Sequence, residues 1–244
     1  MTAGGPRRGV TRERGRRQTV PMTTSELERV LEPEVMDTEE EAREYDAMDH
    51  EGPNRAFVER LIELGAGGRV LDIGCGPGQV ALRIAERIPA SEVLGIDLAR
   101  HMLTVAERNR AASEVAARVR FELADAKGLP YPDGAFDTVC SNTILHHIPD
   151  PEPFLREAGR VLAPGGALLI RDLFRPRDAA AVEALVAEHA ADANPTQREL
   201  FRASLCAALT PSELEELARR AGLDGARVVV DTDRHMSLQR PARR

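Results

Sequence analysis

The chain has 244 residues, 42% hydrophobic and 30% charged, which suits one large domain or two small ones and excludes a wholly disordered chain. Its net charge of −7, and the lack of any run near the roughly 18 consecutive apolar residues of a spanning helix, argue against a nucleic-acid or membrane partner. Its three cysteines, Cys75, Cys140 and Cys206, form no Cys-x-x-Cys pair, which excludes a disulfide scaffold and a zinc ribbon and predicts a cytoplasmic protein.

The first 21 residues have a composition of their own. They hold six Arg against one Glu, a net charge of +5, so the remaining residues together carry −12. The segment lacks the apolar residues of an amphipathic face, and no apolar stretch follows its Arg pairs as an export signal requires. We expect residues 1–21 to be a disordered Arg-rich tail, or sequence translated ahead of a start at Met22.

Three short helices are predicted before the first strand. Residues that suit a helix N-terminus open the first two, over residues 23–31 and 38–48. Residues 54–64 then carry apolar side chains at helical spacing, after a turn-forming Gly-Pro pair at 52–53. We expect residues 22–66 to form a helical lid.

From residue 69 onward, short apolar strands alternate with amphipathic helices. Strands separated by helices of this length pair in parallel through right-handed crossovers. This pattern predicts a doubly wound sheet whose site lies at the carboxyl ends of the strands. The predicted strands cover residues 69–73, 92–96, 119–123, 135–141 and 167–173, and the helices between them cover residues 79–88, 99–117 and 151–162.

The last third of the chain is predicted to add helices and a hairpin. A capping box at Thr210 opens one of these helices, which runs to Ala221. The final two strands would close the sheet as an antiparallel hairpin. The other predicted helices cover residues 179–189 and 197–209, and the two strands cover residues 228–230 and 235–238.

The strongest chemical signal is a glycine-rich turn after the first strand. Residues 70–78 read Val-Leu-Asp-Ile-Gly-Cys-Gly-Pro-Gly, with Asp72 two positions before the first glycine. Glycines remove side chains where a ligand approaches the backbone at the start of a helix. An ordinary tight turn is the alternative, but three glycines in five positions favour a binding turn. A dinucleotide fingerprint needs Gly where this chain has Gln79, so pyrophosphate binding is disfavoured.

Single acids follow the next two strands. Asp97 ends the second strand, 23 positions after Gly74, where an acid can accept hydrogen bonds from both hydroxyls of a ribose. A helix N-cap is the alternative role for Asp97, and the glycine turn favours the ribose. Asp125 follows the third strand, where its carboxylate could accept a hydrogen bond from the exocyclic amine of adenine or serve as a turn residue.

These segments, in this order, resemble a class I S-adenosylmethionine-dependent methyltransferase. Among subgroups the chain most resembles the small-molecule branch that includes the ubiquinone/menaquinone C-methyltransferases. Residues 70–78 are similar to the family's first motif, 95–97 to its ribose acid, 124–126 to its adenine contact, 137–149 to its fourth-strand segment and 162–166 to its turn into the fifth strand.

The resemblance implies a fold and a domain division. The fold class is α/β: a Rossmann-like, doubly wound, mostly parallel seven-stranded sheet with an antiparallel C-terminal hairpin strand and an N-terminal helical lid. The methyltransferase domain would cover residues 67–240, with a helical substrate-side insertion over 174–222. Residues 241–244 would be a tail.

The resemblance also implies which residues hold S-adenosylmethionine. Asp72 and the backbone of the glycine turn would hold the methionine amino and carboxylate groups, and Asp97 would hold the ribose. A sulfonium cation and an ammonium group are favoured near Asp72 in an acidic cleft. In the rest of the implied set, Leu98 and Met102 would pack on the adenine, Asp125 and Ala126 would read its edge, Ser141 or Asn142 would touch the methionine part, and Gly74, Cys75, Gly76 and Gly78 would form the turn.

Methyl transfer needs alignment and, for some acceptors, removal of a proton. His146 and His147 follow the fourth strand, where either could be the general base; alternatively, one packs under the sheet and the other lies on a surface loop. Amino-methylating relatives carry Asn-Pro-Pro-Tyr where residues 142–145 read Asn-Thr-Ile-Leu, which argues against a nucleic-acid or protein amine. No carboxylate cluster with ligand spacing lies beside the histidines in the sequence, so we predict no metal.

Tyr45 and Asp172 complete the candidate catalytic residues. Tyr45 lies in the predicted lid, where a side chain can contact both cofactor and acceptor; a solvated acidic helix is the alternative. Asp172 falls at the carboxyl end of the fifth strand, at the rim of the cleft.

The sequence therefore predicts a methyltransferase (EC 2.1.1.-) that acts on a small organic acceptor by in-line attack. An RNA or protein methyltransferase that uses the Arg-rich tail as an anchor is one alternative. A non-catalytic module that keeps the fold and binds the cofactor is another. Monomer and homodimer both stay open.

Overall fold

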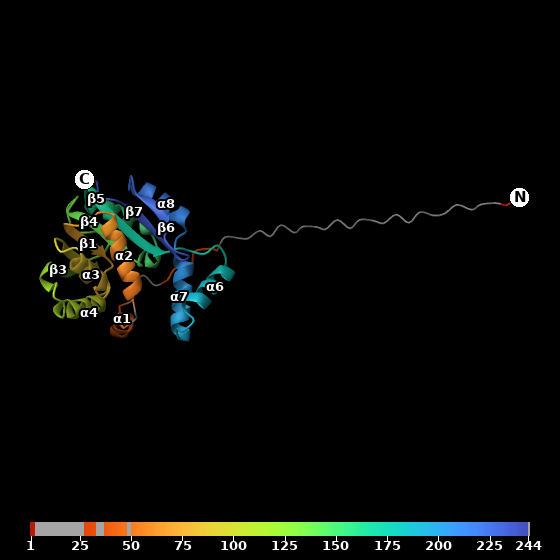
Figure 1. Ribbon diagram of the computed structural model, residues 1–244, viewed down its shortest axis with the longest axis horizontal. Helices are drawn as coiled ribbons and strands as arrows, with labels where there is room; N and C mark the ends of the chain where they lie inside the picture. The colour runs from red at the N-terminus through yellow and green to blue at the C-terminus, as the bar shows by residue number, and fades with distance from the viewer. Residues whose placement is uncertain (3–26, 33–36, 48–49, 244) are drawn as a thin grey trace.

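The computed structural model describes residues 1–2, 27–32, 37–47 and 50–243. Its centre is a seven-stranded sheet in the order β3-β2-β1-β4-β5-β7-β6 (Figure 1). The strands are β1 (Arg69–Ile73), β2 (Glu92–Asp97), β3 (Val119–Leu123), β4 (Phe136–Asn142), β5 (Leu162–Leu173), β6 (Arg227–Val230) and β7 (His235–Arg240).

The first five strands pair in parallel, whereas β7 is antiparallel to both β5 and β6. The cause is the length of the connections, because a parallel crossover needs a dozen or more residues. Most neighbours along the chain are joined through a helix, but only residues 231–234 separate β6 from β7. The predicted Rossmann-like, mostly parallel sheet with an antiparallel C-terminal hairpin is confirmed.

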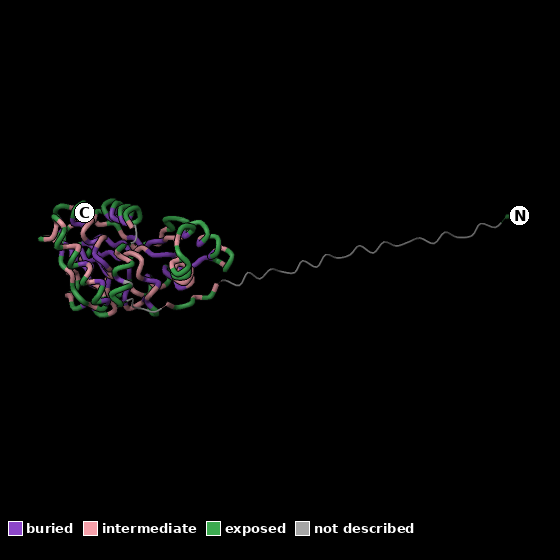
Figure 2. The backbone as a smooth tube through the Cα atoms, turned by 90° about the horizontal axis from the view of Figure 1, so that it is seen from below, coloured by how far each residue is buried: buried purple, intermediate pink, exposed green. Residues whose placement is uncertain are grey.

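Helices cover both faces of the sheet and enclose two large apolar clusters. Phe57, Val58 and Ile84 belong to the cluster under α2 and α3, and Phe154 and Leu155 belong to the cluster under α5 and α8. The buried backbone accordingly runs through the middle of the molecule (Figure 2). The helices are α1 (Glu39–Asp46), α2 (Glu51–Glu63), α3 (Gln79–Arg87), α4 (Arg100–Ala111), α5 (Pro151–Val161), α6 (Ala179–His189), α7 (Pro195–Ala207) and α8 (Pro211–Arg220), with short 3₁₀ turns η1 (Ala116–Arg118) and η2 (Leu145–His147).

The helix predicted over residues 23–31 is wrong where the structure describes it. Residues 27–32 form no helix, and residues 23–26 lie outside the described ranges. The backbone N–H groups of Leu27 and Val30 donate to the carbonyls of Arg177 and Cys206 instead of to their own segment. Tertiary contacts thus determine the conformation of this segment, rather than local helix propensity.

Other elements differ from prediction at their boundaries. The Gly-Pro pair at 52–53 does not precede α2 but lies in its first turn. Proline is tolerated there because a backbone N–H in the first turn has no intrahelical acceptor. α4 ends at Ala111 instead of 117, and β5 begins at Leu162 instead of 167.

The structure describes the C-terminal segment up to residue 243 but only residues 1–2 of the predicted N-terminal tail. Residues 3–21 of the predicted tail lie outside the described ranges. At the other end, Ala242 donates to the carbonyl of Leu64 and Arg243 donates to that of Gly165, so the described part of the 241–244 segment is attached to the domain. Within the described residues, no helix has both the length and the apolar character needed to cross a membrane.

Candidate active site

A cavity opens at the carboxyl ends of β1, β2 and β4. It is lined by the glycine turn after β1, the end of β2, the segment after β3 and the segment after β4. The lid contributes Tyr45, His50 and Asn54. Twelve predicted site residues lie on this wall: Tyr45, Asp72, Gly74, Cys75, Gly76, Asp97, Leu98, Met102, Asp125, Ala126, Asn142 and His147.

The glycine turn is anchored to the neighbouring strand. The N–H groups of Gly74 and Cys75 both donate to the carbonyl of Ile96, at 2.8 and 2.9 Å. Gly74 has a φ of 70°, and a Cβ placed on it would lie 2.6 Å from the side chain of Ile144. Only glycine fits there, because this backbone conformation and this close approach both exclude a side chain.

Asp72 is a buried acid on the cavity wall. The thiol of Cys140 lies 3.7 Å from Oδ1 and donates to it, whereas Oδ2 has no hydrogen-bond partner among the described residues. Burial, and to a smaller extent the charge of Asp97, raise the pKa of Asp72 to about 7, although the contact with Cys140 opposes the shift. A buried carboxylate oxygen without a partner is costly, so this position suits a cationic ligand group.

Asp97 connects the glycine turn to the start of α4. Its Oδ2 accepts a hydrogen bond from the Gly76 N–H and its Oδ1 accepts one from the Ala99 N–H, both at 2.8 Å. Burial raises the pKa of Asp97, although these backbone hydrogen bonds oppose the shift. A carboxylate has about four acceptor positions, so Asp97 retains lone pairs for a ligand in the cavity.

Asp125 also has a local partner. Its Oδ1 accepts from the Lys127 N–H at 2.9 Å and lies 3.0 Å from the Lys127 ammonium, and these contacts outweigh burial and lower the pKa of Asp125. Asp125 is therefore a turn residue that also lines the cavity. Leu98 is 40% exposed and Met102 is buried, and both line the cavity.

Four predicted site residues lie behind the wall. Gly78 is the N-cap of α3, and Ser141 is buried with no hydrogen-bond partner for its hydroxyl among the described residues. His146 and Asp172 are buried against each other, with Nδ1 of His146 2.7 Å from Oδ1 of Asp172. The His146 backbone N–H also donates to Asp172, at 3.0 Å.

Each member of the buried His146–Asp172 pair shifts the pKa of the other. Burial favours the neutral form of His146, but the charge of Asp172 and the hydrogen bond to it outweigh burial and raise the pKa of His146. For the same reason the pKa of Asp172 is lowered despite its burial. The pair fixes η2, from which His147 reaches the cavity.

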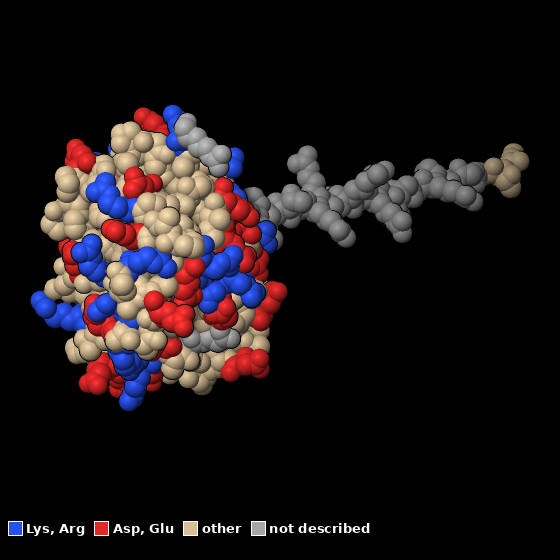
Figure 3. Space-filling view, turned by 60° about the vertical axis from the view of Figure 1, so that its left-hand side comes forward, with Lys and Arg blue, Asp and Glu red and all other residues tan. Residues whose placement is uncertain are grey.

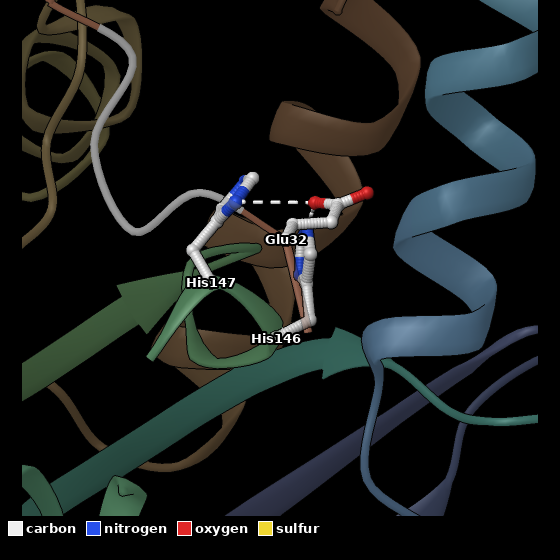
Figure 4. A group of neighbouring side chains, drawn as sticks. All are labelled: Glu32, His146 and His147. Atoms are coloured by element: carbon white, nitrogen blue, oxygen red, sulfur yellow. Dashed lines mark ion pairs between the residues drawn. The ribbon is translucent and has the colours of Figure 1, made fainter. Parts of the chain in front are cut away.

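Two residues near η2 were not predicted. Glu32 places Oε2 3.2 Å from Nδ1 of His147 and 3.9 Å from Nε2 of His146 (Figure 4). Thr143, on the cavity wall, has a φ of 64°, a strained conformation for a β-branched residue that tends to occur at functional sites. No spacing rule links residue 32 to residue 147, and the only local signal was the Pro after Glu32, which favours an extended backbone.

The chain is similar in sequence and in fold to known methyltransferases. The demethylmenaquinone methyltransferase of Thermus thermophilus is 41% identical over 128 residues, 51% of this chain and 57% of that protein. The ubiquinone biosynthesis O-methyltransferase of Chromobacterium violaceum is 35% identical over 167 residues, 68% of each chain. Phosphoethanolamine N-methyltransferase 2 of Haemonchus contortus, solved with S-adenosylhomocysteine, has a TM-score of 0.56 at 27% identity and covers 75% of this chain and 39% of that one.

The chain spans about half the length of the first curated relatives that it matches. A family model described as a methyltransferase domain matches residues 64–222, from the end of the lid through α8. The glycine turn, Asp97 and the histidine pair all fall inside this match. The predicted resemblance is confirmed: the chain belongs to the methyltransferase domain family.

Proposed function

We propose that the protein transfers a methyl group from S-adenosylmethionine to a small organic acceptor (EC 2.1.1.-). The observation that supports the proposal is the cavity itself: Asp72, whose Oδ2 has no hydrogen-bond partner within the described ranges, and Asp97 both line it. These groups match an ammonium and a ribose in the order in which S-adenosylmethionine presents them. When bound, that cofactor supplies a methyl group on a sulfonium sulfur.

The residues present fit the cofactor. Asp72 would accept a hydrogen bond from its ammonium group, and the open backbone at Gly74 and Gly76 would lie along the methionine part. Asp97 would accept from the ribose hydroxyls while keeping its two backbone partners. Leu98 and Met102 would enclose the adenine, beside Asp125 and Ala126.

A small acceptor suits the other end of the cavity. His147, Thr143 and Ile148 line it from the segment after β4, whereas Tyr45 of the lid packs beside Met102 and next to His50. Acidic and basic side chains are interspersed on the face that Figure 3 shows, without a continuous basic stripe. A long nucleic acid needs such a stripe to bind its phosphates, so this face gives no support to that acceptor.

His147 is the better candidate for the general base. His146 is buried and holds Asp172 with its Nδ1, whereas His147 lines the cavity. A base must reach the proton that it removes. We therefore assign His147 to proton removal from the acceptor, and His146 with Asp172 to holding η2.

Acceptor-dependent formation of S-adenosylhomocysteine tests the function. The purified protein would be incubated with S-adenosylmethionine and one of a set of probes, such as a catechol, a hydroquinone and a thiol. We expect at least one probe to yield its methylated product. Cofactor binding without turnover of any probe or of RNA would instead favour the non-catalytic module.

A further inference from the structure

Helix α1 borders the cofactor end of the cavity but has little apolar contact to hold it there. It lies beside α4 (Figure 1), where Ala42 and Tyr45 pack in one small apolar cluster with Met102. The Tyr45 ring lies close to the glycine turn, since a Cβ placed on Gly76 would be 3.9 Å from it. An isolated helix of eight residues is not stable in water, so α1 depends on other elements to stay folded.

Asp46, the last residue of α1, provides polar bonds to two of those elements. Its Oδ2 accepts a hydrogen bond from the Arg108 guanidinium at 2.8 Å, and its Oδ1 accepts one from the Asn109 amide at 2.9 Å, both from α4. The Gln79 amide, at the start of α3, donates to Oδ1 and to the backbone carbonyl of Asp46, both at 3.3 Å. Asp46 therefore fastens the end of α1 to α3 and α4.

Both amides that hold Asp46 also reach the cofactor end of the site. The Asn109 amide donates to the Pro77 carbonyl in the glycine turn at 3.0 Å. The side-chain oxygen of Gln79 accepts from Asn54 on α2 at 3.2 Å, and Gln79 lines the cavity. Gln79 occupies the position at which a dinucleotide fingerprint needs glycine. The side chain that disfavours a pyrophosphate thus joins α1 and α2 beside the glycine turn.

Helix energetics alone does not explain an acid at this position. The C-terminal end of a helix carries a partial negative charge, so a carboxylate there destabilises the helix. In α1 this cost is offset by the partners of Asp46 on α3 and α4. A helix that is held by a few partly exposed polar bonds opens more easily than one that is held by a large apolar core. These are the properties of a cover that opens to exchange a ligand.

We propose that Asp46 is a positioning residue that latches α1 beside the glycine turn and thereby slows the release of S-adenosylmethionine and S-adenosylhomocysteine. The proposal rests on the proposed function, because it concerns the same cofactor. Asp46 is not among the described residues that line the cavity, so it acts through the elements that it joins. No bond is made or broken in the ligand by this latch.

Two measurements on the full chain test the latch: the dissociation rate of S-adenosylhomocysteine and the hydrogen exchange of residues 39–46. We expect Asp46→Ala to release the ligand about tenfold faster, from the loss of a charged hydrogen bond, and to exchange faster over α1 with and without ligand. Exchange in β1 and β4 should stay as in the wild type, which separates local opening from unfolding.

Glu44→Ala is the matched control, because it removes an exposed acid from the same last turn of α1. It should release the ligand at the wild-type rate. If only helix energetics mattered, both variants would slow the exchange of α1. Equal behaviour of the two variants, or a wild-type dissociation rate in Asp46→Ala, would overturn the proposal.

Asn109→Ala tests the same latch from α4, without a change in α1. We expect it to speed dissociation, and the double variant with Asp46→Ala to stay within about twofold of Asp46→Ala alone, because both changes remove one shared contact. Additive effects would contradict a shared latch. Failure of the wild type to bind S-adenosylhomocysteine would overturn the proposed function together with the latch, whereas wild-type binding with unchanged dissociation in the variants would overturn the latch alone.

Discussion

The two ends of the cavity are built in different ways. The cofactor end comes from consecutive strand-to-helix turns, in which Asp72, Gly74 and Asp97 lie within one short stretch of chain. The proposed acceptor end is formed by the segment after β4 and by η2, and Arg29 bonds to η2 from a distant part of the chain. Local turn chemistry therefore builds the proposed cofactor end, whereas tertiary packing builds the proposed acceptor end.

Loss of the proposed base, His147, should produce the largest effect. This effect should be on the rate of methyl transfer and not on cofactor binding. We expect His147→Asn to lower the rate of methyl transfer to a catechol probe by about 100-fold or more, since general-base catalysis contributes roughly 10²–10⁴-fold. Affinity for S-adenosylmethionine should stay within about twofold, because the residue acts on the acceptor. Single-turnover rates and calorimetry measure the two quantities. His189→Asn, at a histidine that pairs with Asp233, is the control. A wild-type rate in His147→Asn would remove this residue from the reaction.

Loss of the ribose acid should affect the cofactor end. We expect Asp97→Ala to weaken binding of S-adenosylmethionine by about 10–100-fold, from the roughly 1–3 kcal/mol of charged hydrogen bonds that it loses. Calorimetric titration gives the affinity, with Asp224→Ala at an exposed loop position as the control. Asp97→Asn keeps one acceptor oxygen and should lie between the two. Full affinity in Asp97→Ala would show that the ribose assignment is wrong.

The substitution Asp72→Asn should weaken cofactor binding but raise the stability of the protein above pH 7. Its pKa is raised to about 7 in the folded protein, above the unfolded value near 4, so its stability contribution is present at low pH and is lost as pH rises through about 7. Asp72→Asn stays neutral, so we expect its melting temperature to exceed that of the wild type above pH 7. Its affinity for S-adenosylmethionine should fall by about tenfold. Thermal unfolding at several pH values checks the first part. A lower melting temperature at high pH would contradict the assigned cost of burying this carboxylate.

Deletion of residues 1–21 should have the smallest effect. Every contact that defines the cavity comes from residue 27 onward in the described chain. We expect cofactor affinity and turnover of a small probe to stay within about twofold of the wild type. Steady-state kinetics and calorimetry would measure both. A large loss of turnover would favour the alternative in which the Arg-rich segment anchors a macromolecular acceptor.

The sequence predicted the sheet and the cofactor end because both depend on short-range patterns. The apolar strands and the glycine turn follow local sequence patterns, but the alternative of Asp97 as a helix N-cap is wrong: the N-cap of α4 is Ala99, and the Asp97 carboxylate accepts from the backbone of Gly76 and Ala99. The conformation of residues 27–31 was predicted wrongly, because Arg29 and the backbone around it bond to distant carbonyls. Glu32 and the positive φ of Thr143 could not be anticipated for the same reason, since only the folded sheet brings their partners near.

Calorimetric titration of the full chain with S-adenosylmethionine tests the central claim most directly. The account predicts saturable binding of one molecule per chain, binding of S-adenosylhomocysteine at the same site, and a marked loss of affinity in Asp97→Ala but not in Asp224→Ala. No binding of either ligand by the folded wild-type protein would contradict the account.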